Sequence, residues 1–170
     1  VKGTKDSTKM AGLMVFIKLA VIGLFIVAGA FYVTPDNWTP FAPNGFEGIF
    51  MGAFLIFFAY IGFDAISTTA EETENPQRDL PIAILGTLIL CTVLYVCVAL
   101  VLTGTVPLNH IDIQAPIAHA MRVIGMDWLA GFISIGALCA LTSVLLIYQL
   151  GTSRILYAMS RDRFLPKSLR

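Results

Sequence analysis

Apolar residues fill four long stretches of the chain, and short polar segments separate them. A helix that crosses the hydrocarbon core of a bilayer needs about 20 mostly apolar residues. The stretches that meet this requirement are approximately 10–33, 48–70, 81–105 and 128–150. The last one continues as a helix to about residue 159, and Pro81 suits the first turn of the third. The pattern predicts an all-α fold, a polytopic transmembrane helical bundle.

The second stretch reads FFAYIGFDAISTTAEE and is interrupted near its middle by Gly62 and Asp64. Glycine tolerates non-helical dihedral angles, and an aspartate can cap a new helix. Inside a bilayer, irregular backbone persists only where it is buried in protein or lines a wet cavity. We therefore expect half-helices over about 48–58 and 64–72, with the break near 59–64.

A broken helix leaves carbonyl groups without partners at the end of its first half, where the helix dipole is negative. The carbonyls of Phe58, Ala59 and Ile61 could therefore bind the ammonium group of a substrate. Tyr60 and Phe63 flank the break and are candidates for the wall or gate of such a pocket.

Gly62 belongs to this candidate substrate-binding segment, and Asp64 is the expected cap of the restarted helix. An alternative is that Gly62 is a helix-packing contact and that Asp64 pairs with a neighbouring side chain. A membrane-embedded enzyme that uses Asp64 with Glu71 or a histidine is a further alternative. No nucleophile or metal-ligand spacing supports catalysis, so we assign no catalytic residue, metal or cofactor.

Lys18 lies in the first apolar stretch, about 12 Å along the helix from Met10. A lysine at bilayer depth costs about 2.5–3.5 kcal/mol and usually faces a bundle interior. Such an amine is a candidate for proton coupling, although it could instead extend to the headgroups. In the fourth stretch, Thr142 and Ser143 are adjacent hydroxyls that could bind an ammonium group or a sodium ion, or simply their own helix carbonyls.

Composition agrees with a membrane protein, because 57% of the residues are hydrophobic and only 13% are charged. A net charge of zero argues against nucleic-acid binding. Cys91, Cys97 and Cys139 lie within apolar stretches at a spacing that fits no zinc site, and we expect them to act as small hydrophobic residues.

Basic residues are concentrated on one side of the predicted membrane. That side holds Lys2, Lys5, Lys9, Arg78, Arg161, Arg163, Lys167 and Arg170. The opposite connections hold only Arg122. The positive-inside rule places the first side in the cytoplasm, so we expect a multi-pass protein of the cell membrane with both ends of this segment cytoplasmic.

The outer connection, 106–127, contains a second helical pattern that begins at Pro116. This helix could be a lid over the outer mouth or an interfacial helix without a gating role. His110 and His119 lie in the same connection, and we expect them to be solvated rather than to bind a metal.

Three motifs together resemble amino acid permeases of the amino acid–polyamine–organocation superfamily, in its cationic amino acid transporter-like branch. They are KLAV, FFAYIGFDAISTTAEETENPQRDLP and CALTSVLLIYQLGTSRILYAMSRDRFLP. The resemblance covers the whole chain and implies the fifth to eighth spans of a longer transporter with the LeuT-type inverted-repeat fold. The other half of the binding pocket would then lie in the remaining spans of the parent transporter.

The resemblance also implies roles for individual residues. Phe58, Ala59 and Ile61 would bind the α-ammonium group through their carbonyls, while Lys18 would replace the sodium ion of sodium-coupled relatives. Thr142 and Ser143 would correspond to the hydroxyls that bind that ion. The terminal Arg161-Asp162-Arg163 departs from the RDG that is usual in this family.

The resulting expectation is proton-coupled amino acid symport by alternating access, with an amino acid, protons and the lipid bilayer as partners. Sodium coupling and exchange remain alternatives within transport. The alternative that does not involve transport is a structural or regulatory helical membrane subunit.

Overall fold

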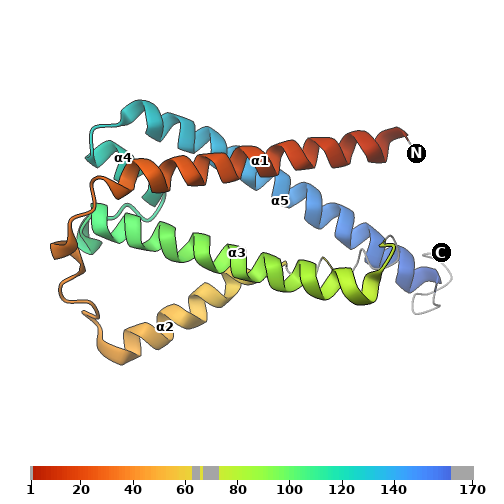
Figure 1. Ribbon diagram of the computed structural model, residues 1–170, viewed down its shortest axis with the longest axis horizontal. Helices are drawn as coiled ribbons and strands as arrows, with labels where there is room; N and C mark the ends of the chain where they lie inside the picture. Colours follow the sequence, from red (N-terminus) through yellow and green to blue (C-terminus); the bar gives the residue numbers. More distant parts are fainter. Residues whose placement is uncertain (1, 63–65, 67–72, 162–170) are drawn as a thin grey trace.

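The computed structural model describes residues 2–62, 66 and 73–161, and this part of the chain contains helices and no β-strand. The predicted all-α fold is therefore confirmed. The long helices are α1 (Lys2–Ala30), α3 (Pro76–Thr105) and α5 (Asp127–Arg161). Each contains a segment long and apolar enough to cross a membrane. Figure 1 shows that α1 starts and α5 ends at the same end of the bundle.

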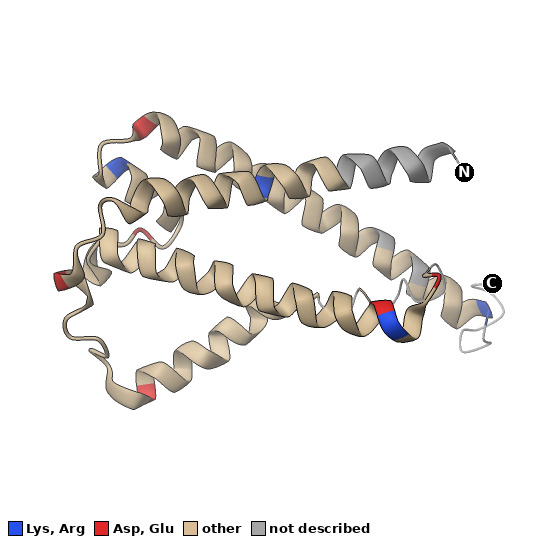
Figure 2. Cartoon of the chain, in the orientation of Figure 1, with Lys and Arg blue, Asp and Glu red and all other residues tan. Residues whose placement is uncertain are grey.

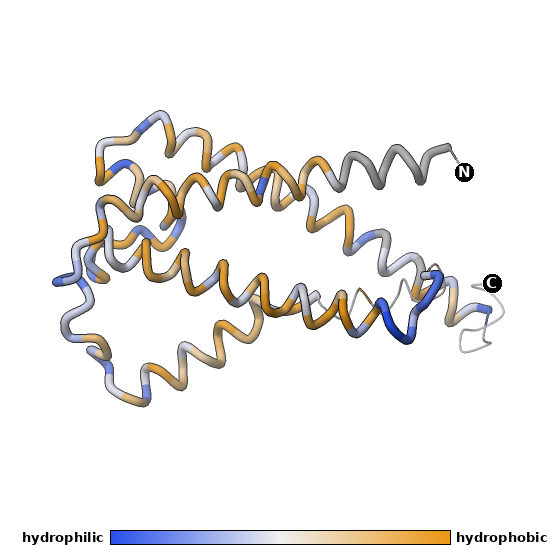
Figure 3. The backbone as a smooth tube through the Cα atoms, in the orientation of Figure 1, coloured by the Kyte–Doolittle hydropathy of each residue, from blue (hydrophilic) through white to orange (hydrophobic). Residues whose placement is uncertain are grey.

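Shorter elements connect the long helices. They are the α-helices α2 (Gly45–Phe57) and α4 (Pro116–Val123), and the 3-10 helices η1 (Pro35–Trp38), η2 (Phe58–Tyr60) and η4 (Leu108–His110). In Figure 1, α2 begins away from α3 and approaches it where α2 ends. Figure 3 shows apolar residues along the helices and polar ones in the connections, and Figure 2 shows most charged residues near helix ends.

Several helix ends differ from those predicted, most of all the starts of α1, at Lys2, and of α3. Helix α3 begins at Pro76 instead of Pro81, because a proline at the first helical position removes an amide that would have no partner there. The carbonyl of Asn75 accepts the amides of Arg78 and Asp79 and closes this first turn. Pro81 lies within α3, where it omits one main-chain hydrogen bond. Helix α1 ends at Ala30, short of residue 33.

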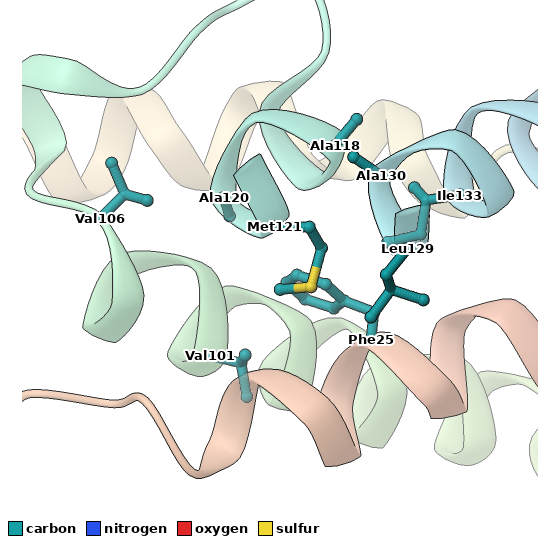
Figure 4. Packing of buried hydrophobic residues seen from close by; sticks show 9 residues of the cluster. All are labelled: Phe25, Val101, Val106, Ala118, Ala120, Met121, Leu129, Ala130 and Ile133. Atoms are coloured by element: carbon teal, nitrogen blue, oxygen red, sulfur yellow. The ribbon is translucent and has the colours of Figure 1, made fainter. Parts of the chain in front are cut away.

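Buried apolar residues gather at the end of the bundle that contains α4. Phe25 of α1, Met121 of α4 and Leu129 of α5 are almost fully buried there, together with Val101 of α3. Figure 4 shows these side chains converging from the four helices. The helix predicted to start at Pro116 is confirmed, and it joins the three long helices at this end.

His119 departs from the expectation that the histidines of this connection are solvated. It lies in α4, and the residue is half-buried. Its Nδ1 atom is buried and makes no hydrogen bond within the part of the chain that the structure describes. His110, at the end of η4, is exposed as expected.

Helices α1 and α5 approach closely at Gly136. A Cβ atom at this position would lie 2.8 Å from Cγ2 of Val21, closer than real side chains pack. The absence of a side chain at Gly136 therefore lets α1 lie directly on α5. Lys18 lies one turn from Val21 along α1, so this crossing brings its amine within reach of α5.

Candidate functional site

The main chain leaves the α-helical path after α2 ends at Phe57. Residues 58–60 form the single 3-10 turn η2, and Ile61 then takes an extended ψ of 134°. Gly62 follows with φ +112°, a conformation that L side chains rarely adopt. The first half-helix and the start of the break thus lie close to the predicted positions.

Carbonyl groups at the break are partly used by the protein itself. The carbonyl of Phe58 accepts the amide of Ile61 at 3.3 Å, which closes the 3-10 turn. The carbonyl of Ala59 accepts the hydroxyl of Tyr95 at 2.9 Å. A carbonyl oxygen has two lone pairs, so each of these groups can accept a second donor. The break therefore offers carbonyl lone pairs to which a further donor could bind.

Tyr60 makes a second connection between the break and α3. Its hydroxyl lies 2.9 Å from Oγ1 of Thr92, and that Oγ1 atom donates to the carbonyl of Leu88 at 2.7 Å. Because the threonine hydroxyl has a single hydrogen, Tyr60 must be the donor to Thr92. The rings of Tyr60 and Tyr95 also meet edge to face, with centroids 5.3 Å apart. Two tyrosine hydroxyls thus connect the break to α3. Tyr95 donates from α3 to the break, and Tyr60 donates from the break to α3.

On its other side, the break contacts α5. A Cβ atom on Gly62 would lie 3.3 Å from the hydroxyl oxygen of Tyr148. Gly62 is therefore both a conformational requirement of the break and a close contact with another helix. The interpretation of Gly62 as the residue that permits the break is therefore compatible with its interpretation as a helix-packing contact.

Lys18 and Ser143 meet across the crossing of α1 and α5. The Nζ atom of Lys18 lies 3.5 Å from Oγ of Ser143, at the long end of the hydrogen-bonding range. Ser143 is fully buried, and its own hydrogen is donated to the carbonyl of Ala140 at 2.8 Å. Its oxygen therefore acts as an acceptor toward Lys18.

Thr142 does not share this contact. Its side chain is exposed, and its hydroxyl donates to the carbonyl of Leu138 at 2.9 Å. Adjacent residues on a helix point in directions about 100° apart, so only one of the two hydroxyls can face Lys18. The structure brings Ser143 to the lysine and leaves Thr142 on another face.

The break and Lys18 line one cavity of about 640 Å³. Its described wall comprises Lys18, residues 58–62, Ile66, a face of α3 and a face of α5. Cavities of about 300–1,000 Å³ are typical of small-molecule sites. The cavity joins the two features that the sequence places far apart in the chain, the helix break and the deep lysine.

Phe63 and Asp64 lie outside the described residues, so their predicted roles as gate and helix cap stay predictions. The wall residues that the sequence analysis did not select include Thr87, Cys91 and Tyr95 of α3. These three recur at every fourth position, so they share one helix face. That recurrence of polar atoms within an apolar stretch is the signal that could have identified them.

These features define a helical membrane protein with a helix break and a half-buried amine at one cavity. Comparison with known proteins agrees with this class. The family model described as amino acid permease matches residues 1–170. The chain therefore belongs to the amino acid permease family.

Among curated proteins, the chain is similar to the methylthioribose transporter of Bacillus subtilis (strain 168), with 45% identity over 165 residues, 97% of this chain and 36% of that protein. The branched-chain amino acid permease BcaP of the same organism is 45% identical over 168 residues, 98% of this chain and 36% of its own length. The chloroplastic cationic amino acid transporter 9 of Arabidopsis thaliana is 44% identical over 165 residues, 97% of this chain and 29% of its own length.

The chain thus spans about a third of the length of the curated relatives it matches. These relatives are named as transporters and permeases and not as enzymes, in agreement with the expectation from the sequence.

Proposed function

We propose that this chain forms part of a carrier that moves amino acids across a membrane by proton-coupled symport. The observation that carries the proposal is that the carbonyls of the helix break and the amine of Lys18 line the same cavity. Membership of the amino acid permease family supports the choice of an amino acid as substrate. Branched-chain and cationic amino acids both occur in the names of its relatives.

The substrate ammonium group would bind at the end of α2. The last carbonyls of a helix carry partial negative charge, which stabilises a cation without a charged side chain. Phe58 and Ala59 supply such carbonyls at the cavity, and their second lone pairs accept the ammonium hydrogens. Ile61 also lines the cavity and completes this candidate binding segment.

Proton coupling would depend on Lys18. Its protonated amine donates to the buried Ser143 and so stabilises the contact between α1 and α5. Loss of the proton removes the charge and weakens this hydrogen bond, since bonds to a charged group are about twice as strong as neutral ones. Proton binding and helix packing are thereby linked, as alternating access requires.

In this proposal, the carrier lies in the cell membrane with both ends of the segment in the cytoplasm. The concentration of basic residues outside 34–47 and 106–127 supports this orientation. The apolar faces of α1, α3 and α5 would contact lipid and the remaining spans of the transporter. Helix α4 would then lie at the outer surface, over the ends of these helices.

The test is uptake of radiolabelled amino acids into proteoliposomes that contain the full-length protein carrying these residues. Uptake should follow an imposed pH gradient and should not require sodium. Lys18→Ala should abolish the response to pH, and Lys18→Arg should do the same, because a guanidinium keeps its charge throughout the working range.

Three outcomes would contradict the proposal. Sodium-dependent uptake without a response to pH would assign the coupling to sodium. Uptake that requires an amino acid on the opposite side would show exchange. The absence of uptake of any amino acid by well-folded protein would favour a structural or regulatory subunit.

A further inference from the structure

The segment between α1 and α2 lies on the last turns of α3 (Figure 1). The indole Nε1 of Trp38 donates to Oγ1 of Thr103 at 3.1 Å. The side-chain amide of Asn37 donates to the carbonyl of Gly104 at 2.7 Å, and the main-chain amide of Thr34 donates to the same carbonyl at 2.9 Å. Hydrogen bonds from three residues thus connect this segment to α3.

Gly104 suits this contact in two ways. Carbonyl groups in the last turn of a helix have no partner within the helix, so the carbonyl of Gly104 needs donors from elsewhere. Asn37 and Thr34 supply them, one for each lone pair. A Cβ atom on Gly104 would lie 2.7 Å from Cγ1 of Val33 and 3.1 Å from Cζ2 of Trp38. The absence of a side chain therefore lets the segment lie directly on α3.

The same chemistry connects α3 to the segment that follows α2. Thr103 donates its hydrogen to the carbonyl of Ala99 at 2.7 Å and therefore accepts from Trp38. Thr92 likewise donates to a carbonyl of its own helix and accepts the hydroxyl of Tyr60. An aromatic donor and a threonine acceptor thus hold the chain to α3 both before and after α2.

The two threonines lie on one face of α3. Thr92 and Thr103 are 11 residues apart, which corresponds to about three turns, or about 17 Å along the helix. Helix α2 has 13 residues, so it is about 20 Å long. None of its residues is buried in the described part of the chain. Within that part, the position of α2 therefore depends on the segments at its two ends.

We infer that Trp38 and Thr103 are positioning residues that hold the start of α2, and that they act on the helix break through this helix. When the bond between them is lost, α2 can pivot about its attachment at Thr92. The carbonyls at the end of α2 are then presented in a wider range of directions. The expected effect on transport rests on the proposed function, whereas the expected effect on the position of α2 does not.

The position of α2 can be measured in the full-length protein by the distance between two spin labels. The labels are attached at Glu47→Cys in α2 and Arg122→Cys in α4, which are both exposed positions, after the other cysteines have been replaced. Helix α4 is the fixed reference, because its Met121 is fully buried. Trp38→Phe and Thr103→Val should each broaden the distribution of distances. Thr103→Ser keeps the hydroxyl and should retain the narrow distribution.

Uptake of a labelled amino acid into proteoliposomes gives the second readout. Trp38→Phe and Thr103→Val should each raise the half-saturating concentration about threefold, with a smaller change in the maximal rate, because one hydrogen bond is lost. The double variant should be no worse than either single variant, since both remove the same bond. Trp128→Phe is the matched control, because Trp128 is exposed on α5, where its ring contacts Phe132. It should change neither readout.

The outcomes separate this inference from the proposed function. An unchanged distribution of distances in Trp38→Phe and Thr103→Val would show that other contacts hold α2, and it would overturn the inference. A broadened distribution with an unchanged half-saturating concentration would also overturn it, because the start of α2 would then have no influence on the break. Failure of the parent protein to transport any amino acid would instead refute the proposed function, and the distances would still decide whether Trp38 holds α2.

Discussion

The hydroxyl of Tyr95 in α3 donates a 2.9 Å hydrogen bond to the main-chain carbonyl of Ala59, at the break after α2. Ala59 lies in the short 3-10 turn η2, and this bond helps to fix the direction of its carbonyl and of the lone pair that stays free. Tyr95 is therefore a positioning residue for the proposed ammonium site.

Replacement of Tyr95 by phenylalanine tests this role. Tyr95→Phe removes one hydrogen bond, which contributes about 1 kcal/mol, and should raise the half-saturating substrate concentration about fivefold. The maximal rate should change less, because the ring and its edge-to-face contact with Tyr60 remain. Tyr157→Phe, at an exposed position of α5, is the control. Equal effects of the two changes would show that the bond to Ala59 has no particular role.

The break itself is tested at Gly62. Gly62→Ala forces a side chain into φ +112° and against Tyr148, with an expected cost of about 1–3 kcal/mol. Uptake should fall by about tenfold or more, measured per molecule of folded transporter. Gly52→Ala, in the interior of α2 with open space around it, should be neutral or slightly stabilising. Full activity of Gly62→Ala would mean that the break does not need this backbone conformation.

The adjacent hydroxyls of Ser143 and Thr142 in α5 provide a test of proton coupling and its control. Ser143→Ala removes the acceptor from Lys18 and should flatten the dependence of uptake on pH, with a loss of about tenfold at the optimum. Thr142→Ala removes a hydroxyl whose hydrogen bond, in the described part of the chain, is to Leu138 of its own helix, and it should leave the pH profile in place. The two profiles are measured over the same pH series. If Ser143→Ala and Thr142→Ala gave the same dependence of uptake on pH, Ser143 would have no specific role in proton coupling.

The crossing of α1 and α5 is tested by stability rather than by transport. Gly136→Ala places a Cβ atom 2.8 Å from Val21, so it should destabilise the protein by about 1–3 kcal/mol relative to Gly131→Ala. Gly131 lies on the same helix, and a Cβ atom added there would have no other atom within 4 Å. Both variants gain the higher helix propensity of alanine, so the difference between them reports the contact with Val21. Thermal unfolding in detergent gives the comparison. Identical transition temperatures would show that the helices can separate at this point without cost.

The helices and the break were largely predictable because they depend on local sequence. Length and hydropathy locate α1, α3 and α5, since a bilayer demands a long apolar run. Gly62 marks the break because few other residues adopt its conformation. The start of α3 was misplaced because both Pro76 and Pro81 are compatible with a helix start, and sequence alone does not choose between them.

The contacts of the site could not be predicted from local sequence. Tyr95 and Ala59 are 36 residues apart, and Lys18 and Ser143 are 125 residues apart. Such contacts depend on how each helix is rotated about its axis, and an almost uniformly apolar helix shows little preference for one face. The family resemblance suggested the pairing of Lys18 with α5, whereas nothing in the sequence analysis suggested Tyr95.

The hydrogen bond from Ser143 to Ala140 has a consequence for what can replace Lys18. A hydroxyl that has given away its hydrogen offers only electron pairs, so it can face a donor or a cation but not an anion. If the Lys18 amine left Ser143, the hydroxyl oriented in this way would offer an electron pair, which suits water or a metal cation better than chloride. The orientation of one buried hydrogen thus favours hydrogen-bond donors and cations at this position.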